Sequence, residues 1–451
     1  MSVRLSLTVP MVVAAAAVVL VTRQPVSDSD LFWHLANGRD VLAGVAGTDH
    51  ESWTVAGNAV PMDQWLGDLV WYGAYALGGW TGVIALRALV VGAFAFVVVA
   101  TALAAAPRRP LIALLAALPA LVVARYAWTD RPELFGVLCF AVLIALLRTE
   151  RALLEVALLF LVWSNLHGSW ALGLVLALLA LGHRALARPD RRRQAILIAA
   201  LCVVACVPTL VREQLLTTSQ FWRPPREISE WSVPDVTTMP GLAFALTLAA
   251  TIVLAFAARR RDDRDVVLLV PTLFVAMSAQ RHMPFFPVAA AAFLARAGTE
   301  VWERASGTEA GADALGPLAR AAAGVVLALA FVGGIATAPS APDLTGYPSA
   351  ALASLPSGPG MLNQYDWGGY LIWYAPRTPV FVDGRLVPYR ASGVLDDYRA
   401  VVAAHPGWEA IADRRGIRTM LVRPGDAIAV RAPDRGWHVA YADATAVVLV
   451  R

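Results

Sequence analysis

Lysine is absent from this chain of 451 residues, so all 37 basic residues are arginine, and charged residues make up only 16% of the sequence. Soluble globular proteins average about 25% charged and about 45–50% apolar residues. Here 58% of the residues are hydrophobic and the mean hydropathy is +0.60. This composition excludes a soluble enzyme and an intrinsically disordered protein.

Cysteine is scarce, and the excess of positive charge is small. Cys139, Cys202 and Cys206 all lie inside apolar runs, so we expect small buried core residues and neither a disulfide framework nor a zinc site. The net charge is only +4, and the arginines stand between apolar runs instead of gathering on one face. The pI of about 9.1 therefore does not indicate a nucleic-acid partner.

Long apolar runs dominate the first three quarters of the chain. A membrane-spanning helix needs about 20 mainly apolar residues. The sequence predicts eleven such spans, at residues 5–22, 80–105, 110–125, 132–148, 152–165, 168–187, 194–211, 240–258, 265–280, 284–298 and 318–337. The first run is interpreted as an uncleaved span because no small-x-small cleavage site precedes Arg23.

The placement of arginine predicts the orientation of these spans. The connections densest in arginine, at residues 184–193, 259–264 and 296–320, fall on the same side as Arg4. Cytoplasmic loops carry an excess of Lys and Arg, so we expect a cytoplasmic N-terminus. An odd number of spans then places the C-terminus outside the cytoplasm.

The C-terminal quarter reads as a small α/β domain. We expect a transmembrane domain over residues 1–338, a linker rich in Pro, Ser and Ala over 339–359, and an extracytoplasmic domain over 360–451. Its expected strands lie at 361–362, 380–382 and 418–422, with a terminal hairpin ending at 445–450. Its expected helices lie near 368–374, 394–405 and 408–415.

In this topology the unusual polar residues collect in the outer loops. Asp28 and Asp30 directly follow the first span, and a helix starting near Asp30 would place His34 on the same face. We interpret all three as candidate catalytic residues. The alternative is that Asp28 or Ser29 is a helix N-cap.

Several later residues are candidates for binding a substrate in one shared outer cavity. Arg87 lies about two turns inside a long apolar helix and needs an anionic or carbonyl partner, although it could also extend to the lipid headgroups. The other candidates occupy outer turns, and some are explained simply by the polarity that such turns require: Arg131, Asn165, His167, Arg281 and His282.

Tryptophan recurs beside these charges, and Trp33 lies within the first polar loop. An interfacial aromatic belt explains most of these residues, while stacking against a sugar ring is the alternative for Trp33. His167 and His282 could join Asp28 or Asp30 as ligands of a divalent metal ion, but the spacing is not that of a metal motif. We therefore expect no obligatory cofactor.

The arrangement resembles the GT-C superfamily of membrane glycosyltransferases. The matching run is Asp28-Ser29-Asp30 after the first span. The chain also resembles an uncharacterised bacterial family across nearly its whole length, through residues 30–35 with Gly38, 165–168, 365–371 and 383–385.

This resemblance implies a multi-span enzyme in a bacterial inner membrane that takes a sugar from a polyprenyl-phosphate carrier. It further implies a catalytic Asp in the first outer loop and transfer, with inversion, to a glycan, lipid or protein acceptor outside the cytoplasm. Two other functions stay open, a transporter or flippase of lipids or glycans and a non-catalytic membrane assembly protein. A transporter would be expected to show inverted repeats, which the sequence does not reveal.

Overall fold

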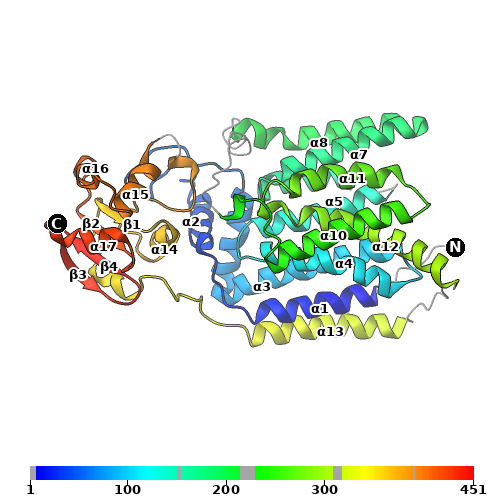
Figure 1. Cartoon of the computed structure of the whole chain (residues 1–451), viewed down its shortest axis with the longest axis horizontal. Coiled ribbons are helices and arrows are strands. Elements are labelled where there is room, and N and C mark those ends of the chain that lie inside the picture. The colour runs from blue at the N-terminus through cyan, green and yellow to red at the C-terminus, as the bar shows by residue number, and fades with distance from the viewer. Residues whose placement is uncertain (1–6, 150–153, 214–228, 308–316, 390–391) are drawn as a thin grey trace. The chain divides into compact units, whose positions relative to one another are not determined.

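The structure is a computed structural model that describes residues 7–149, 154–213, 229–307, 317–389 and 392–451 (Figure 1). Contacts divide the chain into two units. The helical unit contains Met1–Pro25 and Gly78–Ser340, and the α/β unit contains Val26–Leu77 and Ala341–Arg451. Residues 26–77 therefore group with the C-terminal segment, whereas the sequence assigned them to a domain over 1–338.

The helical unit consists of long apolar helices that run side by side (Figure 1). They are α1 (Thr8–Thr22), α4 (Pro110–Ala124), α5 (Glu133–Arg148), α6 (Leu154–Leu166), α7 (Trp170–Ala187), α8 (Arg192–Glu213), α10 (Met239–Ala257), α11 (Asp263–Ala276), α12 (Phe285–Ser306) and α13 (Pro317–Ala336). Short 3-10 turns lie at η1 (Arg125–Ala127), η2 (Pro189–Arg191), η3 (Ser229–Trp231) and η4 (Gln280–His282).

Helix α3 (Trp65–Ala105) is the one element that both units share, and it is kinked at Gly79. Gly79 has φ 57° and ψ −146°, a conformation open essentially to glycine alone. The run predicted at residues 80–105 therefore begins directly after this kink.

Each of the eleven predicted runs coincides with a helix. Among the described residues, six helices are long and apolar enough to cross a membrane: Trp65–Ala105, Pro110–Ala127, Trp170–Ala187, Pro189–Val211, Met239–Ala257 and Leu318–Ala336. The helices Thr8–Thr22 and Leu154–Leu166 are apolar but shorter. The chain thus has the helices of a membrane protein, and the count of eleven spans stays a prediction.

Helix α12 forms the centre of the helical unit because its N-terminal half carries small residues. Ala289, Ala290, Ala291 and Ala292 are almost completely buried, and α12 packs against α4, α10, α11 and α5. Small side chains let membrane helices approach closely. Large apolar side chains point outward instead, as Phe256 and Phe274 do, which suits contact with lipid.

The α/β unit is built on a four-stranded sheet in the order β1-β2-β4-β3. Its strands are β1 (Met361–Asn363), β2 (Thr419–Val422), β3 (His438–Ala442) and β4 (Val447–Val450), and its helices are α2 (Ser29–Ala43), α14 (Gly368–Tyr374), α15 (Val394–Val402), α16 (Trp408–Arg415) and α17 (Ala427–Arg431). Strand β1 pairs parallel with β2, and β4 pairs antiparallel with both β2 and β3. Helix α2 packs against α14, so the segment that carries Asp28 and Asp30 is part of this unit.

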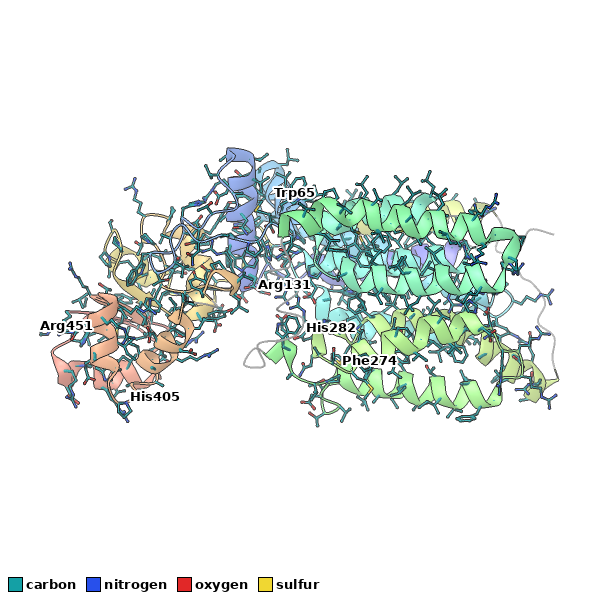
Figure 2. All side chains as sticks on the ribbon, turned by 90° about the horizontal axis from the view of Figure 1, so that it is seen from above. Trp65, Arg131, Phe274, His282, His405 and Arg451 are labelled. Atoms are coloured by element: carbon teal, nitrogen blue, oxygen red, sulfur yellow. The ribbon has the colours of Figure 1, made fainter. Side chains whose placement is uncertain are left out.

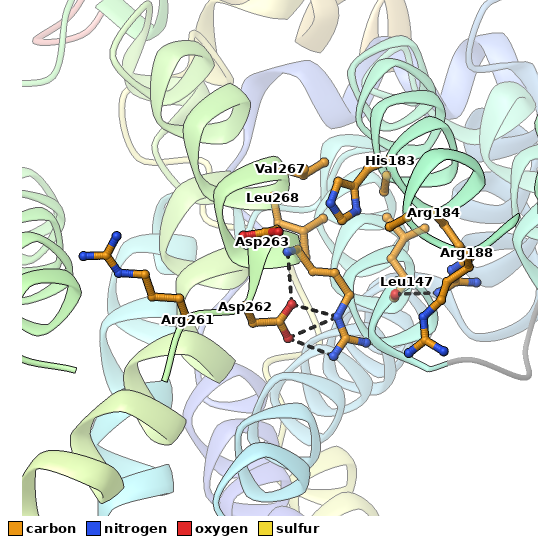
Figure 3. A pocket seen from close by; sticks show the side chains of 12 residues that line it. Leu147, His183, Arg184, Arg188, Arg261, Asp262, Asp263, Val267 and Leu268 are labelled. Atoms are coloured by element: carbon orange, nitrogen blue, oxygen red, sulfur yellow. Dashed lines mark hydrogen bonds and ion pairs between the residues drawn. The ribbon is translucent and has the colours of Figure 1, made fainter. Parts of the chain in front are cut away.

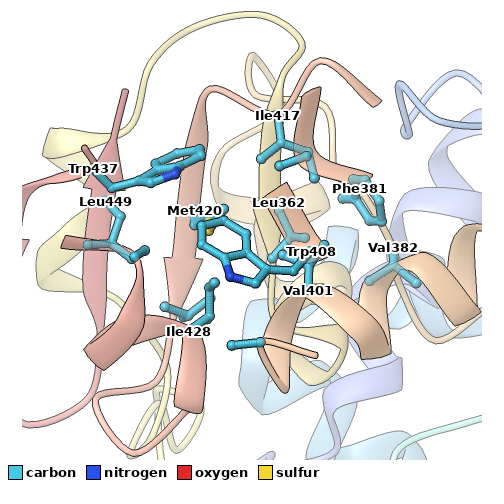
Figure 4. Packing of buried hydrophobic residues seen from close by; sticks show 14 of the residues in the cluster. Leu362, Phe381, Val382, Val401, Trp408, Ile417, Met420, Ile428, Trp437 and Leu449 are labelled. Atoms are coloured by element: carbon cyan, nitrogen blue, oxygen red, sulfur yellow. The ribbon is translucent and has the colours of Figure 1, made fainter. Parts of the chain in front are cut away.

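The core of this unit follows from the sequence pattern (Figure 4). The central strands β2 and β4 are continuous apolar runs, and Met420 pairs with Leu449 at the middle of the sheet. Val394 and Val401 lie two turns apart on α15 and both are fully buried. Strand β3 closes the sheet and is largely exposed.

Two expected segments have a different structure. Residues 380–382 were predicted as a strand, but only an isolated bridge joins Val380 to Ser52. The reason is that Asn363 uses its side chain to bond the backbone of Phe381 and Val382, in place of a strand ladder. The expected linker 339–359 contains the 3-10 turn η5 (Ala350–Ser354), where Ala351 is fully buried.

Candidate functional site

The acidic pair of the first outer loop begins helix α2. Asp28 is the N-cap, and its Oδ1 accepts a hydrogen bond from the backbone N–H of Asp30 at 2.9 Å. Asp30 lies in the first turn, and its Oδ1 accepts from Trp33 Nε1 at 3.1 Å. Both aspartates are partly exposed. The cap that sequence reasoning offered as an alternative therefore exists, and it leaves both carboxylates held in defined positions.

Glycine gives the backbone of residues 383–385 close access to this pair. A Cβ on Gly384 would lie 2.4 Å from Asp30 Oδ1 and 3.0 Å from Trp33 Nε1. A Cβ on Gly369 would lie 2.8 Å from the carbonyl oxygen of Ser29. Two of the motifs that carried the family resemblance thus meet the acidic pair inside the α/β unit.

His34 is bonded by Asp68, a residue that sequence reasoning did not select. Its Nδ1 lies 2.6 Å from Asp68 Oδ1, and the His34 side chain is 3% exposed. Asn37 donates to the other oxygen of Asp68 at 3.3 Å. Asp30 and His34 lie four residues apart on α2, and the buried pair with Asp68 fixes the imidazole against the ring of Trp33.

A second charged cluster in the α/β unit contains Arg39, Asp40, His50 and Glu51. Among the described residues, Asp40, His50 and Glu51 are the three that could hold a metal ion, since their ligand atoms lie within 4.8 Å of one another. Arg39, however, already donates to Asp40 at 3.3 Å and to Glu51 at 3.2 Å. The arginine supplies the positive charge that a cation would bring, so this cluster fits an ion-pair network better than a metal site.

A fully buried ion pair joins the first outer loop to the 383–385 motif. Arg385 donates to Asp383 through Nε at 2.8 Å and Nη2 at 2.7 Å, and Nη2 also lies 2.7 Å from Asp49. Burial acts to raise the pKa of Asp383, but the adjacent Arg385 outweighs it and holds that pKa below its usual value. Tyr389 donates to the same carboxylate at 2.5 Å. This network orders the loop that faces the acidic pair.

In the helical unit, Arg87 has the two kinds of partner expected for a guanidinium inside an apolar helix. Its Nη1 donates to Asp130 at 2.9 Å, and its Nη2 donates to the carbonyl of Val21 at 2.8 Å and to that of Gln24. The Arg87 residue is 2% exposed. It therefore caps the C-terminal end of α1 and links it to the loop before α5.

Arg131 and Arg281 belong to a group of four charges, which we call the quartet, together with Glu133 and Glu230. Arg131 Nη2 lies 3.0 Å from Glu133 and 2.7 Å from Glu230. Arg281 makes longer contacts, 3.9 Å to Glu133 and 3.7 Å to Glu230, and its guanidinium lies 4.7 Å from the centre of the Trp231 ring. The quartet is electrically neutral as a group.

His282 and His167 lie around the same end of α5, and Figure 2 places Arg131 and His282 together at this end of the helices. Burial lowers the pKa of His282 to about 4, with the neighbouring Arg281 acting in the same direction. The imidazole is therefore neutral at pH 7, and its Nδ1 lies 2.9 Å from Ser278 Oγ. Gly136, on α5, leaves room for His167, whose Nδ1 would lie 2.6 Å from a Cβ there.

Asn165 is bound largely by its own helix. Its Nδ2 donates to the Leu161 carbonyl at 2.9 Å, and Thr209 donates to its Oδ1 at 3.5 Å. His167 Nδ1 and Ser169 Oγ are 2.9 Å apart in the following turn. These contacts order the tight connection between α6 and α7.

The predicted site residues therefore form two groups. The α/β unit holds Asp28, Asp30, Trp33 and His34, and the helical unit holds Arg87, Arg131, Asn165, His167, Arg281 and His282. Sequence reasoning missed the carboxylates that partner the basic residues: Asp68, Asp130, Glu133 and Glu230. Alternating charge over residues 130–133, just before an apolar run, was the available signal.

Comparison with known proteins gives matches in structure only. No family model matches the chain, and no curated protein matches its sequence. The oligosaccharyltransferase AglB of Archaeoglobus fulgidus, solved with an inhibitory peptide and a dolichol-phosphate, has a TM-score of 0.58 at 10% identity, covering 92% of this chain and 69% of AglB. Its apo form gives a TM-score of 0.57 at 10% identity, with 93% and 69% covered.

ArnT of Cupriavidus metallidurans, solved bound to undecaprenyl phosphate, has a TM-score of 0.54 at 13% identity. The match covers 98% of this chain and 97% of ArnT. Both similar proteins are GT-C membrane glycosyltransferases. The chain therefore shares its fold with these two proteins, and its long apolar helices are those of a membrane protein.

Proposed function

We propose that this protein is a membrane glycosyltransferase that moves a sugar from a polyprenyl-phosphate donor to an extracytoplasmic acceptor. The observation that carries the proposal is the likeness in fold to ArnT, which spans nearly all of both chains. The ArnT structure is bound to undecaprenyl phosphate and an AglB structure to a dolichol-phosphate, so lipid phosphates occupy two similar proteins. The apolar helices of this chain would bring its own site to the same kind of lipid.

The acidic pair supplies the general base of the proposed reaction. The carboxylate of Asp30, or that of Asp28, takes the proton from an acceptor hydroxyl as its oxygen attacks C1 of the sugar. The bond from C1 to the phosphate oxygen breaks, the configuration at C1 inverts, and polyprenyl phosphate leaves. Both aspartates are partly exposed and each is oriented by a hydrogen bond, as a positioned base requires.

The leaving phosphate needs positive charge, and we assign this role to Arg281 because its ion pairs are longer than those of Arg131. Its contacts to Glu133 and Glu230 are 3.7–3.9 Å long, longer than ordinary charge-assisted hydrogen bonds. A phosphate can thus compete for Arg281 at smaller loss than for Arg131, whose contact to Glu230 is 2.7 Å long. Neutral His282 adds a hydrogen-bond donor beside it.

The remaining candidates act in positioning roles in this proposal. Arg87 fixes the end of α1, from which the chain enters the acidic pair. Asn165 and His167 orient the sugar, Trp33 stacks on its ring, and His34 holds Trp33 through ring contact. The proposal places the protein in a bacterial inner membrane with a cytoplasmic N-terminus, and the α/β unit then holds the acceptor outside the cytoplasm.

The test replaces the carboxylates without disturbing their hydrogen bonds. Asp30→Asn keeps an oxygen for Trp33, and Asp28→Asn keeps an N-cap acceptor, but neither amide can act as a base. Membranes containing each variant are given undecaprenyl-phosphate-linked sugars labelled in the sugar, and transfer to the membrane fraction is measured. We expect transfer to fall by about 100-fold or more for the catalytic residue.

The control for this test is Asp413→Asn, because Asp413 is an exposed carboxylate on α16 that pairs with Arg451. Its transfer rate is expected to equal that of the unchanged protein. Full transfer in both Asp28→Asn and Asp30→Asn contradicts the general-base role. Movement of the labelled lipid across the bilayer with no transfer of sugar would instead indicate a flippase.

A further inference from the structure

The helical unit contains a cavity of about 390 Å³ at the end of α5 that lies opposite to the quartet. Glu133 begins α5 and Leu147 lies one residue from its end, so about 21 Å of helix separate the two places. The cavity lies between the C-terminal part of α7 and the start of α11 (Figure 3). It is separate from every residue proposed above for catalysis.

The lining of this cavity combines basic, acidic and apolar residues. Four arginines and two aspartates line it, which leaves an excess of two positive charges: Arg184, Arg188, Arg261, Arg264, Asp262 and Asp263. Figure 3 shows Arg184 and Arg188 on the α7 side and Asp262 on the α11 side. Leu147, Val267 and Leu268 form the apolar part of the wall.

Hydrogen bonds hold two of the cavity's arginines in defined positions. Arg184 Nη2 donates to the carbonyls of Leu147 and Thr149 at 3.2 and 2.9 Å, so it caps the C-terminal end of α5. Arg264 is held by Asp262 through two bonds, of 3.0 and 2.8 Å. Arg188 extends from the last turn of α7 and is exposed.

The positive-inside rule explains why arginine is dense in these connections, but it does not explain a cavity. That rule requires no particular geometry. Here Arg184 on α7 and Arg264 on α11 line one volume together with apolar residues of α5 and α11. A basic rim over an apolar wall at the end of a membrane helix matches the two halves of an anionic phospholipid.

We infer that this cavity binds a phosphate ester, with the headgroup of an anionic phospholipid as the source that its apolar wall favours. The guanidinium groups of Arg188 and Arg264 contact the phosphate oxygens, and Leu147, Val267 and Leu268 contact the first carbons of the acyl chains. The lipid belongs to the leaflet opposite to the one in which the proposed transfer takes place. Its role is then to fix the ends of α5, α7 and α11 against one another.

The test uses the full chain in a neutral detergent and measures thermal stabilisation by added ligand. Phosphatidylglycerol, phosphatidylcholine and inorganic phosphate are titrated in separate arms. Arg188→Gln combined with Arg264→Gln removes two charges of the cavity, and both side chains are exposed. Arg192→Gln combined with Arg193→Gln is the matched control, because these exposed residues begin α8 at the same end of the unit but do not line the cavity.

We expect phosphatidylglycerol to stabilise the unchanged protein and the control, with half-saturation at least about tenfold higher in the cavity variant. Arg188→Gln alone is expected to raise half-saturation about threefold, which preserves the test if the double variant does not fold. Stabilisation by inorganic phosphate with the same dependence on the variants supports a soluble phosphate ester as the ligand.

Three results would overturn the inference. One is an equal weakening of phosphatidylglycerol binding in the cavity variant and the control, because the overall positive charge at this end of the helical unit would then explain the binding. Another is equal stabilisation by phosphatidylcholine and phosphatidylglycerol, since the negative charge would then have no effect. The third is the absence of stabilisation by both phosphatidylglycerol and phosphate.

Discussion

The two ends of helix α5 hold arginine in different surroundings. At the N-terminal end, Arg131 and Arg281 face two glutamates, and the quartet carries no net charge. At the C-terminal end, four arginines share a cavity with two aspartates. Matched charges in a buried place hold a geometry, whereas an excess of one sign calls for a ligand of the other sign.

Arginine therefore has two different roles in the helical unit. In the quartet an anion must displace a carboxylate before it reaches an arginine, so binding there is selective for a ligand that brings further contacts. In the cavity the lining carries more positive than negative side chains, so an anion is attracted by the net charge. The predictions below test this contrast, beginning with the largest expected effect.

Removing a carboxylate from the quartet, at the N-terminal end of α5, should reduce the stability of the fold the most. Glu133 is 5% exposed and contacts both arginines, so Glu133→Ala leaves buried positive charge with one carboxylate in place of two. We expect a loss of about 3–5 kcal/mol in the free energy of unfolding. Thermal unfolding in detergent measures it, and Glu155→Ala on the exposed face of α6 serves as the control, with little change. A loss as small as that of the control would show that the quartet does not stabilise the fold.

Replacing Arg281 should affect transfer more than stability. If Arg281 binds the leaving phosphate, Arg281→Gln removes a charge that acts in the transition state, and transfer should fall about 100-fold, equivalent to about 2.7 kcal/mol. The labelled-sugar assay measures it. Arg192→Gln, at the other end of the unit, is expected to leave transfer unchanged. An unchanged rate in Arg281→Gln would remove the residue from the proposed mechanism.

Acid should lower the stability of the folded protein through His282, which lies beside the quartet, over a defined range of pH. The pKa of His282 is lowered from 6.5 to about 4 in the folded protein, so the unfolded chain takes up this proton first as the pH falls. Stability is therefore lost from about pH 6.5 down to about pH 4. His282→Gln should flatten the melting temperature over this range, whereas His405→Gln, at an exposed site of the α/β unit, should not. Equal slopes in both variants would contradict this prediction.

The smallest effect is expected when the cavity gains net positive charge instead of losing it. Asp262 is the N-cap of α11 and accepts from the backbone N–H of Arg264 at 3.0 Å. Asp262→Asn keeps that cap but increases the positive excess of the cavity, so phosphatidylglycerol should bind a few times more tightly. Asp262→Ala loses the cap as well and should cost about 1 kcal/mol of stability. Weaker binding of phosphatidylglycerol to Asp262→Asn would contradict the role of net charge.

Periodicity and length predicted the helices well because the bilayer imposes both. Each apolar run from 5–22 to 318–337 contains a helix, since a chain in lipid must satisfy its backbone internally. In the C-terminal segment the runs at 361–362 and 418–422 overlap β1 and β2. Residues 380–382 were predicted wrongly because an Asn side chain, whose partner cannot be read from the sequence, replaces a strand ladder.

The candidate site was predicted in its residue types but not in its partners. Asp28 and Asp30 were selected for their position after an apolar run, and the structure gives them neighbours from residues 369 and 384. The pairing of His34 with Asp68 joins residues that are 34 positions apart, and that of Arg131 with Glu230 joins residues 99 positions apart. No local pattern encodes such distances, because they depend on how separate hairpins pack.

The α/β unit combines two segments that are far apart in the chain, and this has a consequence during synthesis of the protein. Residues 26–77 leave the ribosome early, yet helix α2 packs against α14, which is made only after residues 78–340. At rates of roughly 5–20 residues per second, this early segment waits tens of seconds for its partner. During that interval its apolar face has no native cover, so a nascent chain stalled before residue 341 is the form of this protein most exposed to aggregation and proteolysis.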